Sequence, residues 1–219
     1  MHVFLHGFLG TSADWQPVIE ELRLPSLALD LPGHGTAPFT PHFNELLYAA
    51  TSHLPPFHLV GYSMGGRLAL QFARAHPEKI ASLTLLSTHL GLPNESARKE
   101  RLQQDVLLAK RILETSVDEF LKQWYDQPLF RTLVSKMDIV SMRKKQDRAA
   151  LAEAVYAFSL GHQPDFSSTS ASLLVGEYDE IYQRHYAGKN PIIIPNAGHA
   201  AHLENPTAVA NELLKGLSL

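Results

Sequence analysis

The sequence predicts an α/β fold in which a mostly parallel sheet is flanked by helices and carries an inserted helical cap. Short apolar runs alternate with longer stretches of helical pattern, which is typical of parallel sheets covered on both faces. The chain has 219 residues, of which 45% are hydrophobic, and this is enough to bury one substantial core. We therefore expect a single domain over residues 1–219.

Six short apolar runs are predicted as strands, and helices fill most of the gaps between them. The runs lie near residues 2–6, 26–30, 57–61, 81–87, 171–175 and 191–194. The final helix has the clearest start, because Asn205 is a favourable N-cap and Pro206 suits the first helical position. Its inward stripe is expected from three aliphatic residues, Val209, Leu213 and Leu214.

A long segment separates the fourth and fifth predicted strands and is too large for a simple crossover. Its pattern is helical throughout, so we expect a cap inserted over the pocket at about residues 91–162. Near the start of this segment, four apolar side chains recur at helical spacing and predict one apolar face, namely Leu102, Val106, Ala109 and Leu113. The same spacing places Arg98, Arg101 and Asp105 on another face.

A serine lies between glycines at the turn from the third predicted strand to the following helix. The sequence G-Y-S-M-G-G begins at Gly61 and places Ser63 at this turn. It is the G-x-S-x-G nucleophile elbow, in which the turn forces the serine into a strained backbone region and exposes its side chain. Glycines two residues to either side relieve the crowding that side chains would cause. Ser63 is therefore the candidate catalytic serine.

The partners that a catalytic serine needs are expected later in the chain, first the acid and then the histidine. Asp179 follows the strand predicted at 171–175, and His199 lies on the loop after the strand predicted at 191–194. Open α/β sheets place their ligand-handling groups at these carboxyl ends of strands. Because the order, the strand-end positions and the elbow agree, Asp179 and His199 are the candidate acid and base.

Negative charge that develops on a substrate oxygen needs hydrogen-bond donors nearby. The first predicted strand runs into the turn H-G-F at residues 6–8, and such a turn leaves a backbone N–H group free. We assign the oxyanion hole to the backbone amides of Phe8 and Met64. The turn D-L-P-G-H-G, which begins at Asp30, is expected at the same edge of the sheet. The three turns together outline one pocket rim.

Arg67 lies four residues after Ser63, about one helical turn along, so its guanidinium can reach the pocket. A neutral ester gains nothing from a cation there, whereas a carboxylate gains a charge-assisted, bidentate partner. An ordinary salt bridge to a neighbouring acid would also explain this residue. Its position beside the serine shifts the expected substrate toward anions.

Five motifs, matched in order over nearly the whole chain, resemble the α/β-hydrolase superfamily. They are H-G-F, D-L-P-G-H-G, G-Y-S-M-G-G, G-E-Y-D and A-G-H. The resemblance implies the fold of that superfamily and places Ser63, Asp179 and His199 on its triad positions. Members commonly carry one or two antiparallel strands before the first strand found here, so we expect a version trimmed at this edge.

Further motifs resemble one family within it, the 2-succinyl-6-hydroxy-2,4-cyclohexadiene-1-carboxylate synthases of menaquinone biosynthesis. They are G-Y-S-M-G-G-R, the G-L-P-N that precedes the helix of Arg98 and Arg101, and W-Y-D-Q-P-L-F, which is the most specific. The resemblance implies a substrate site lined by five residues, Tyr62, Arg67, Arg101, Trp124 and Arg143. The sequence around Arg143 matches only loosely.

The resemblance also implies the reaction, the elimination of pyruvate from 2-succinyl-5-enolpyruvyl-6-hydroxy-3-cyclohexene-1-carboxylate, without a cofactor or a metal. The triad would remove a proton from the substrate ring, and the oxyanion hole would stabilise the resulting enolate. The same residues would serve a small-molecule carboxylic ester or thioester hydrolase, so the triad does not separate the two reactions. A non-catalytic ligand receptor is a third interpretation, but such a protein need not keep all three triad residues.

Composition argues against several other classes of partner. The net charge of −3 and the pI near 6.4 disfavour binding to nucleic acid or to an anionic membrane. No cysteine is present to form disulfides, and no apolar stretch approaches the roughly 20 residues that span a bilayer. We find no signal-peptide pattern and expect a cytoplasmic enzyme. Despite twelve histidines, no H-E-x-x-H occurs, so we expect no metal; the oligomeric state is not predicted.

Overall fold

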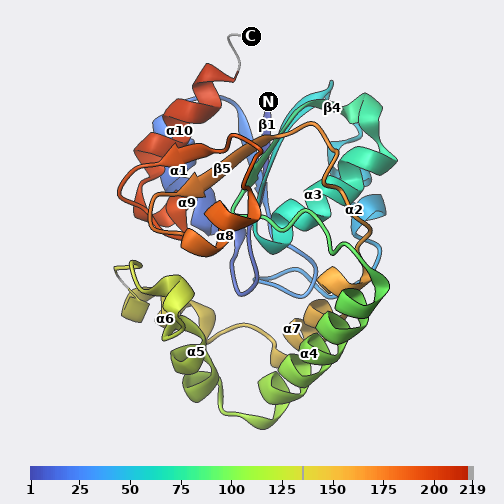
Figure 1. The fold of residues 1–219 in the computed structure, drawn as a ribbon, viewed down its shortest axis with the longest axis vertical. Coiled ribbons are helices and arrows are strands. Elements are labelled where there is room, and N and C mark those ends of the chain that lie inside the picture. Colours follow the sequence, from blue (N-terminus) through green and yellow to red (C-terminus); the bar gives the residue numbers. More distant parts are fainter. Residues whose placement is uncertain (135, 217–219) are drawn as a thin grey trace.

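The computed structural model describes residues 1–134 and 136–216, and its centre is a six-stranded sheet (Figure 1). The spatial order is β2-β1-β3-β4-β5-β6, and all neighbouring pairs are parallel. The strands are β1 (His2–Leu5), β2 (Ser26–Leu29), β3 (Phe57–Tyr62), β4 (Ile80–Leu86), β5 (Ser172–Gly176) and β6 (Ile192–Ile194). The predicted fold class is therefore confirmed, and the strand ends lie within one residue of those expected.

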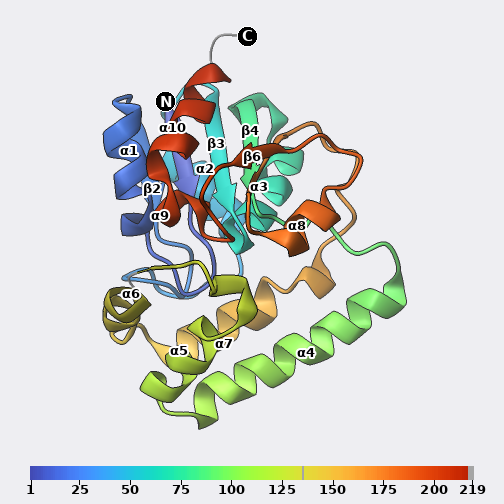
Figure 2. The same cartoon turned by 60° about the vertical axis from the view of Figure 1, so that its left-hand side comes forward.

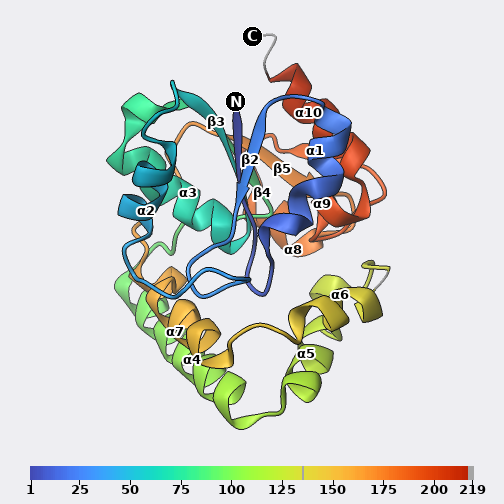
Figure 3. The ribbon, with the colours of Figure 1, turned by 180° about the vertical axis from the view of Figure 1, so that it is seen from behind.

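Helices cover both faces of the sheet (Figures 1 and 3). One face packs against α1 (Gln16–Leu22), α9 (Ala201–Glu204) and α10 (Pro206–Lys215), and the other against α2 (Phe43–Thr51) and α3 (Met64–Ala75). The shorter elements are η1 (Ser12–Trp15), η2 (Pro77–Lys79) and α8 (Glu180–His185). Successive strand residues point to opposite faces, so two apolar cores form, one on each side of the sheet. In the described part of the chain, no helix has the length and apolar character needed to cross a membrane.

Helix α10 begins as the sequence predicts. The Asn205 side chain accepts a hydrogen bond from the Ala208 N–H group at 3.1 Å, and Pro206 occupies the first turn, where no intrahelical N–H donor is needed. Val209 and Leu213 are buried, whereas Leu214 is only partly buried. The inward stripe therefore consists mainly of the first two aliphatic residues.

The segment between β4 and β5 lies across the carboxyl ends of the strands (Figures 1 and 2). Its elements are α4 (Glu95–Glu114), α5 (Val117–Tyr125), η3 (Pro128–Phe130), α6 (Lys136–Arg143), α7 (Arg148–Ala157) and η4 (Leu160–His162). Helix α7 packs along α4, while α5 and α6 form the other end (Figure 3). We call residues 91–162 the cap; their division from the rest of a single domain stays a prediction.

The predicted apolar face of α4 is wrong for two of its four residues. Val106 is 46% exposed and Leu113 is 54% exposed, whereas Leu102 and Ala109 are partly buried. The buried residues of α4 are Asp105 and Ile112, and Arg101 lies one turn before Asp105 on the same side. Because α4 crosses above the strand ends instead of packing on the sheet, its inward side covers a cavity and is partly polar.

The buried His6 side chain joins the turn after β1 to the turn after β2. Its Nε2 atom accepts a hydrogen bond from the Leu31 N–H group at 2.9 Å, and its Nδ1 atom donates to the Gly7 carbonyl at 2.7 Å. This pattern requires a neutral imidazole, since a charged ring has no acceptor. Burial lowers the pKa of His6 to about 4, and it lowers the pKa of His34, whose ring centroid is 5.2 Å away, to about 3.

Gly65 lies where the first turn of α3 presses against the end of β1. A Cβ atom there would clash with the His6 carbonyl oxygen and come within 2.5 Å of the Leu5 carbonyl oxygen. We expect Gly65→Ala to lower the free energy of unfolding by about 3 kcal/mol, because relief would require a shift of the strand or the helix. Urea unfolding measures this change. The control is Gly216→Ala, where the nearest described atom is 3.5 Å away; equal losses in the two variants would contradict the argument.

Acid should destabilise the fold through its buried histidines. Burial lowers the pKa of His6 to about 4 and the pKa values of His34 and His202 to about 3, from 6.5 in the unfolded chain. As the pH falls, these histidines bind protons in the unfolded chain before they do so in the folded protein, and this favours unfolding. The stability that they contribute is therefore complete above pH 6.5 and is lost as the pH falls toward 4. The expected loss is up to ~1.4 kcal/mol per pH unit for each histidine. Urea unfolding at pH values of about 7, 6 and 5 tests this window, and a constant free energy of unfolding would refute it.

Candidate active site

Ser63 joins β3 to α3 in a backbone conformation that few residues other than glycine adopt. Its φ is 50° and its ψ is −110°, a strained combination for a residue with a side chain. The Ser63 N–H group donates to the Leu86 carbonyl at 3.0 Å, and the Ser63 carbonyl accepts from the Arg67 N–H group at 3.1 Å. A Cβ atom on Gly61 would lie 2.5 Å from the Gly66 Cα atom. The turn is therefore held by hydrogen bonds at the end of β3 and the start of α3, and by the close packing of these two elements through Gly61 and Gly66.

A buried carboxylate and a buried imidazole meet next to this turn. The Nδ1 atom of His199 donates to Oδ2 of Asp179 at 2.8 Å. The same oxygen accepts a hydrogen bond from the Ser87 hydroxyl at 2.8 Å, and Oδ1 accepts one from the Tyr182 N–H group at 3.3 Å. With the proton on Nδ1, the Nε2 atom of His199 is left as a proton acceptor.

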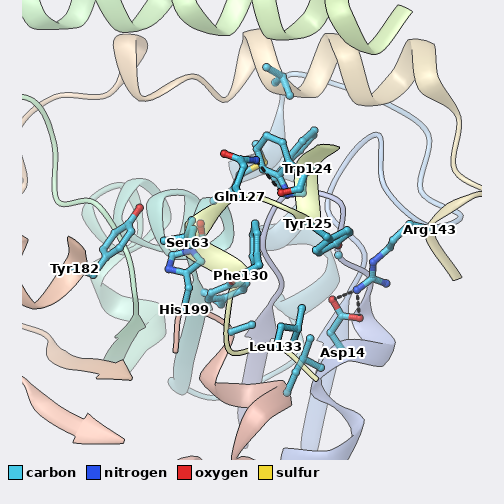
Figure 4. A pocket seen from close by; sticks show the side chains of 18 of the residues that line it. Asp14, Ser63, Trp124, Tyr125, Gln127, Phe130, Leu133, Arg143, Tyr182 and His199 are labelled. Carbon is cyan, nitrogen blue, oxygen red and sulfur yellow. Dashed lines mark hydrogen bonds and ion pairs between the residues drawn. The ribbon is translucent and has the colours of Figure 1, made fainter. Parts of the chain in front are cut away.

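Ser63 and His199 line the same cavity (Figure 4). Three aromatic rings hold the His199 ring, with centroid separations of 4.9 Å for Tyr182, 5.2 Å for Tyr62 and 5.9 Å for Phe130. Among the described residues, no hydrogen bond joins Ser63 to His199; bonds of this kind often tighten only in the substrate complex. The structure brings the predicted triad together, and the catalytic roles of its members stay predictions.

Phe8 and Met64, whose backbone amides are predicted to form the oxyanion hole, both line the same cavity. Met64 is the first residue of α3, so its N–H group has no carbonyl partner within the helix. The turn that carries Phe8 is pressed against the elbow, because a Cβ atom on Gly7 would lie 3.4 Å from the Ser63 Cβ atom. Within the described ranges, neither amide donates to another protein group. Both donors are therefore free, and their role as an oxyanion hole stays a prediction.

The cavity above Ser63 has a volume of about 300 Å³ and lies between the strand ends and the cap. The cap residue Trp124 closes it from above and packs edge-on against Phe8, with ring centroids 5.0 Å apart. Nine predicted site residues line it, namely Phe8, Tyr62, Ser63, Met64, Arg67, Arg101, Trp124, Arg143 and His199. Asp179 lies behind His199. In the part of the chain that the structure describes, no three His, Cys, Asp or Glu side chains gather as metal ligands would.

Arg67 is buried in the cavity wall, with 8% of its surface exposed. Its Nη1 atom donates to the Phe158 carbonyl at 2.6 Å, and no carboxylate pairs with it among the described residues. Burial, with the nearby charge of Arg101, lowers the pKa of Arg67 to about 10, so the group still carries its charge at neutral pH. The salt bridge considered from the sequence is thus not found, and a buried charge without a direct counter-ion favours an anionic ligand.

Arg101 reaches the cavity from α4 and is oriented by Asp105. The Nε atom of Arg101 donates to both carboxylate oxygens of Asp105, at 3.0 and 2.9 Å. Asp105 also accepts a hydrogen bond from the Ser159 hydroxyl at 2.7 Å and is almost fully buried. The terminal nitrogens of Arg101 make no protein hydrogen bond within the described ranges, so they can bind a ligand while Asp105 holds the guanidinium in place.

Arg143 reaches the cavity from α6 and, unlike Arg67, forms a buried ion pair with a carboxylate. Its Nη2 atom donates to both carboxylate oxygens of Asp14 at 2.6 Å, and both side chains are buried (Figure 4). Burial alone would lower the pKa of Arg143, but Asp14 keeps it above its ordinary value. This ion pair ties the cap to η1. Arg143 therefore has a structural role besides the predicted one.

Several residues of the cavity and its surroundings were not predicted from the sequence. Asp14 and Ser87 bond to Arg143 and Asp179 across long stretches of chain, and no local pattern marks them. Gln127 donates to the Trp124 carbonyl at 2.9 Å; it belongs to the W-Y-D-Q-P-L-F motif and could have been found there. Other missed lining residues are Asp105, Tyr125, Phe130, Tyr182 and His202.

Curated relatives match the chain over nearly its full length. The model of the alpha/beta hydrolase family matches residues 3–212. A relative from Enterobacter sp. (strain 638), named 2-succinyl-6-hydroxy-2,4-cyclohexadiene-1-carboxylate synthase, is 37% identical over 99% of this chain and 91% of its own length. A relative of the same name from Salmonella heidelberg (strain SL476) is 35% identical over 99% and 93%.

Solved structures agree with these relatives. MenH from S. aureus has a TM-score of 0.89 and 27% identity, over 99% of this chain and 92% of that one. A thermophilic esterase from Thermogutta terrifontis, solved with malate bound, has a TM-score of 0.75 and 22% identity over 99% and 89%, and it shares the fold. The fold, the site and the matched relatives together place this chain in the alpha/beta hydrolase family and, within it, in the family of 2-succinyl-6-hydroxy-2,4-cyclohexadiene-1-carboxylate synthases.

Proposed function

We propose that this protein eliminates pyruvate from 2-succinyl-5-enolpyruvyl-6-hydroxy-3-cyclohexene-1-carboxylate and forms 2-succinyl-6-hydroxy-2,4-cyclohexadiene-1-carboxylate in menaquinone biosynthesis. The observation that carries the proposal is the buried guanidinium of Arg67, one helical turn from Ser63 and without a carboxylate partner among the described residues. A polycarboxylate substrate supplies that counter-charge, whereas a neutral ester leaves it uncompensated. The name shared by the relatives supports the same reaction, and we expect the enzyme to work in the cytoplasm.

In the first step, the triad removes a proton from the ring carbon next to the succinyl carbonyl. Ser63 Oγ takes this proton as its own passes to Nε2 of His199, whose ring Asp179 holds in place. The electron pair of the broken C–H bond moves onto the carbonyl oxygen and forms an enolate. The amides of Phe8 and Met64 donate hydrogen bonds to that oxygen.

In the second step, the electron pair of the enolate returns to the ring and expels the enolpyruvyl group. A new ring double bond forms, the existing one shifts, and the C–O bond to the enolpyruvyl group breaks. The leaving enolate takes up a proton, which His199 can return, and becomes pyruvate. Protons and electrons balance within the substrate, so no oxidant or reductant is required.

The cap and the strand ends supply the remaining substrate contacts. Arg101 presents its terminal nitrogens to the carboxylates, while Trp124 and Phe8 form an apolar edge that excludes water from the reacting carbon. Tyr62 lines the cavity next to His199. Arg143, held by Asp14, bounds the other side of the site. Binding energy from these contacts positions the ring over Ser63, and positioning is a large part of the rate.

The purified wild-type enzyme should release pyruvate from the enolpyruvyl substrate without added metal, nucleotide or cofactor, and EDTA should not change the rate. A coupled lactate dehydrogenase assay measures the release. Hydrolysis of p-nitrophenyl acetate should be slow by comparison, because a small neutral ester cannot use the arginine contacts. Efficient ester hydrolysis together with no pyruvate release would replace the proposal with the hydrolase alternative.

Ser63→Ala should reduce kcat for pyruvate release by at least about a thousandfold, and His199→Ala nearly as much, since triad members act as a unit. Ser63→Ala should keep the wild-type circular dichroism spectrum and urea midpoint, because the Ser63 hydroxyl contributes almost no packing. Near-native pyruvate release by Ser63→Ala would show that the assigned serine is not the catalytic group.

Arg67→Ala and Arg101→Ala should each weaken kcat/KM for the polycarboxylate substrate by roughly 2 to 5 kcal/mol, because each removes one partner of a desolvated ion pair. Arg98→Ala is the matched control on α4, since Arg98 bonds to the Leu92 carbonyl and does not line the cavity. Steady-state kinetics with p-nitrophenyl acetate should show far smaller effects. Equal losses with both substrates would indicate structural damage and not carboxylate recognition.

A further inference from the structure

The hydroxyl of Tyr182 is a polar group of the cavity wall that the mechanism above leaves unused. Tyr182 lines the cavity, and its ring centroid lies 4.9 Å from that of His199. In Figure 4 the Tyr182 oxygen points toward the top of the view, where the helices of the cap cross. Among the described residues this hydroxyl makes no hydrogen bond, so its donor is available to a ligand.

The triad acid fixes the position of Tyr182. Asp179 is the N-cap of α8, and its side chain accepts a hydrogen bond from the Tyr182 N–H group at 3.3 Å. The Tyr182 ring also packs edge-on against His185 and Tyr186, with centroids 6.0 and 6.4 Å away. Asp179 therefore orients the base and places this phenol beside it.

Tyr186, one turn after Tyr182, is a nearby tyrosine with a packing role and serves as a comparison. It is fully buried, and its hydroxyl accepts from the Thr88 N–H group at 2.7 Å and donates to the Thr88 carbonyl at 2.8 Å. Buried phenols are normally satisfied in this way. Tyr182 keeps only its ring in packing contacts and presents its oxygen to the cavity, which indicates a ligand contact.

Two cations, Arg67 and Arg101, line the same cavity as Tyr182. Burial raises the pKa of Tyr182, although the charges of Arg67 and Arg101 act in the opposite direction, so the phenol stays protonated. A protonated phenol and two guanidinium groups all donate, and a carboxylate only accepts, with about four lone-pair sites. The three groups therefore all offer donors to a carboxylate bound in this cavity.

We propose that Tyr182 is a specificity-determining residue whose hydroxyl donates a hydrogen bond to the substrate carboxylate that Arg67 and Arg101 bind. The inference rests on the proposed function, because it adds a third donor for the same polycarboxylate. The two arginines supply charge, and the phenol supplies a donor of fixed direction, since its ring is wedged against His199 and α8. A substrate without a carboxylate at this point leaves the contact unused.

Tyr182→Phe tests the inference because it removes only the oxygen. We expect KM for the enolpyruvyl substrate to rise at least about tenfold, with kcat within about twofold of wild type. Kinetics with p-nitrophenyl acetate should not change, whereas damage to the His199 environment would lower kcat for both substrates. The matched control is Tyr178→Phe, an exposed tyrosine outside the cavity, which should match wild type. An unchanged KM in Tyr182→Phe, or equal losses with both substrates, would overturn the inference.

Calorimetric titration with succinate separates this inference from the proposed function. If the wild-type enzyme releases pyruvate and Tyr182→Phe keeps the wild-type KM, the inference is wrong and the function stands. If the wild-type enzyme releases no pyruvate, the proposed function fails and the Kd of succinate decides. A Kd that is about tenfold higher in Tyr182→Phe than in wild type and Tyr178→Phe supports the carboxylate contact, and equal Kd values refute it.

Discussion

The strained backbone of Ser63 is the constraint on which the rest of the site depends. A serine with a φ of 50° persists here because β3 and α3 meet through glycines that leave no room for side chains. The same turn directs Oγ into the cavity and frees the Met64 amide, while the turn that carries Phe8 packs against it. The Ser63 hydroxyl and the backbone amides of Phe8 and Met64 are therefore placed by one packing arrangement, and a change in any part of it shifts the others.

Buried polar contacts join the cap to the turns that follow the strands, and they fix the position of the cap over the cavity. Gln146 donates to the Leu9 carbonyl at 2.7 Å and accepts from the Gly35 N–H group at 3.2 Å, so the chain after α6 is bonded to the turns that follow β1 and β2. The Asp14 and Arg143 ion pair reinforces this connection. In the cavity between the cap and the strand ends, Arg67 remains charged without a direct counter-ion in the described structure. This arrangement is expected of a preorganised binding site for a polyanion.

The fold and the grouping of the triad could be predicted because both follow from short segments. Residues after parallel strands meet at one edge of the sheet, so Ser63, Asp179 and His199 come together once the strands are recognised. The cap was less predictable, because α4 covers a cavity and leaves Val106 and Leu113 in solvent while burying Asp105. Contacts such as the one between Asp14 and Arg143, 129 residues apart, depend on tertiary packing and have no local pattern. Tyr182 belongs to the same class, since the direction of its hydroxyl depends on how α8 packs beside His199.

The structure of Ser63→Ala bound to the enolpyruvyl substrate is the most direct test of the claim that buried cations orient a polycarboxylate over the triad. We expect one substrate carboxylate within about 3.2 Å of the guanidinium groups of Arg67 and Arg101. We also expect the succinyl carbonyl oxygen to lie at a similar distance from the amides of Phe8 and Met64. A bound substrate whose carboxylates face solvent, with Arg67 still bonded only to the Phe158 carbonyl, would contradict this claim.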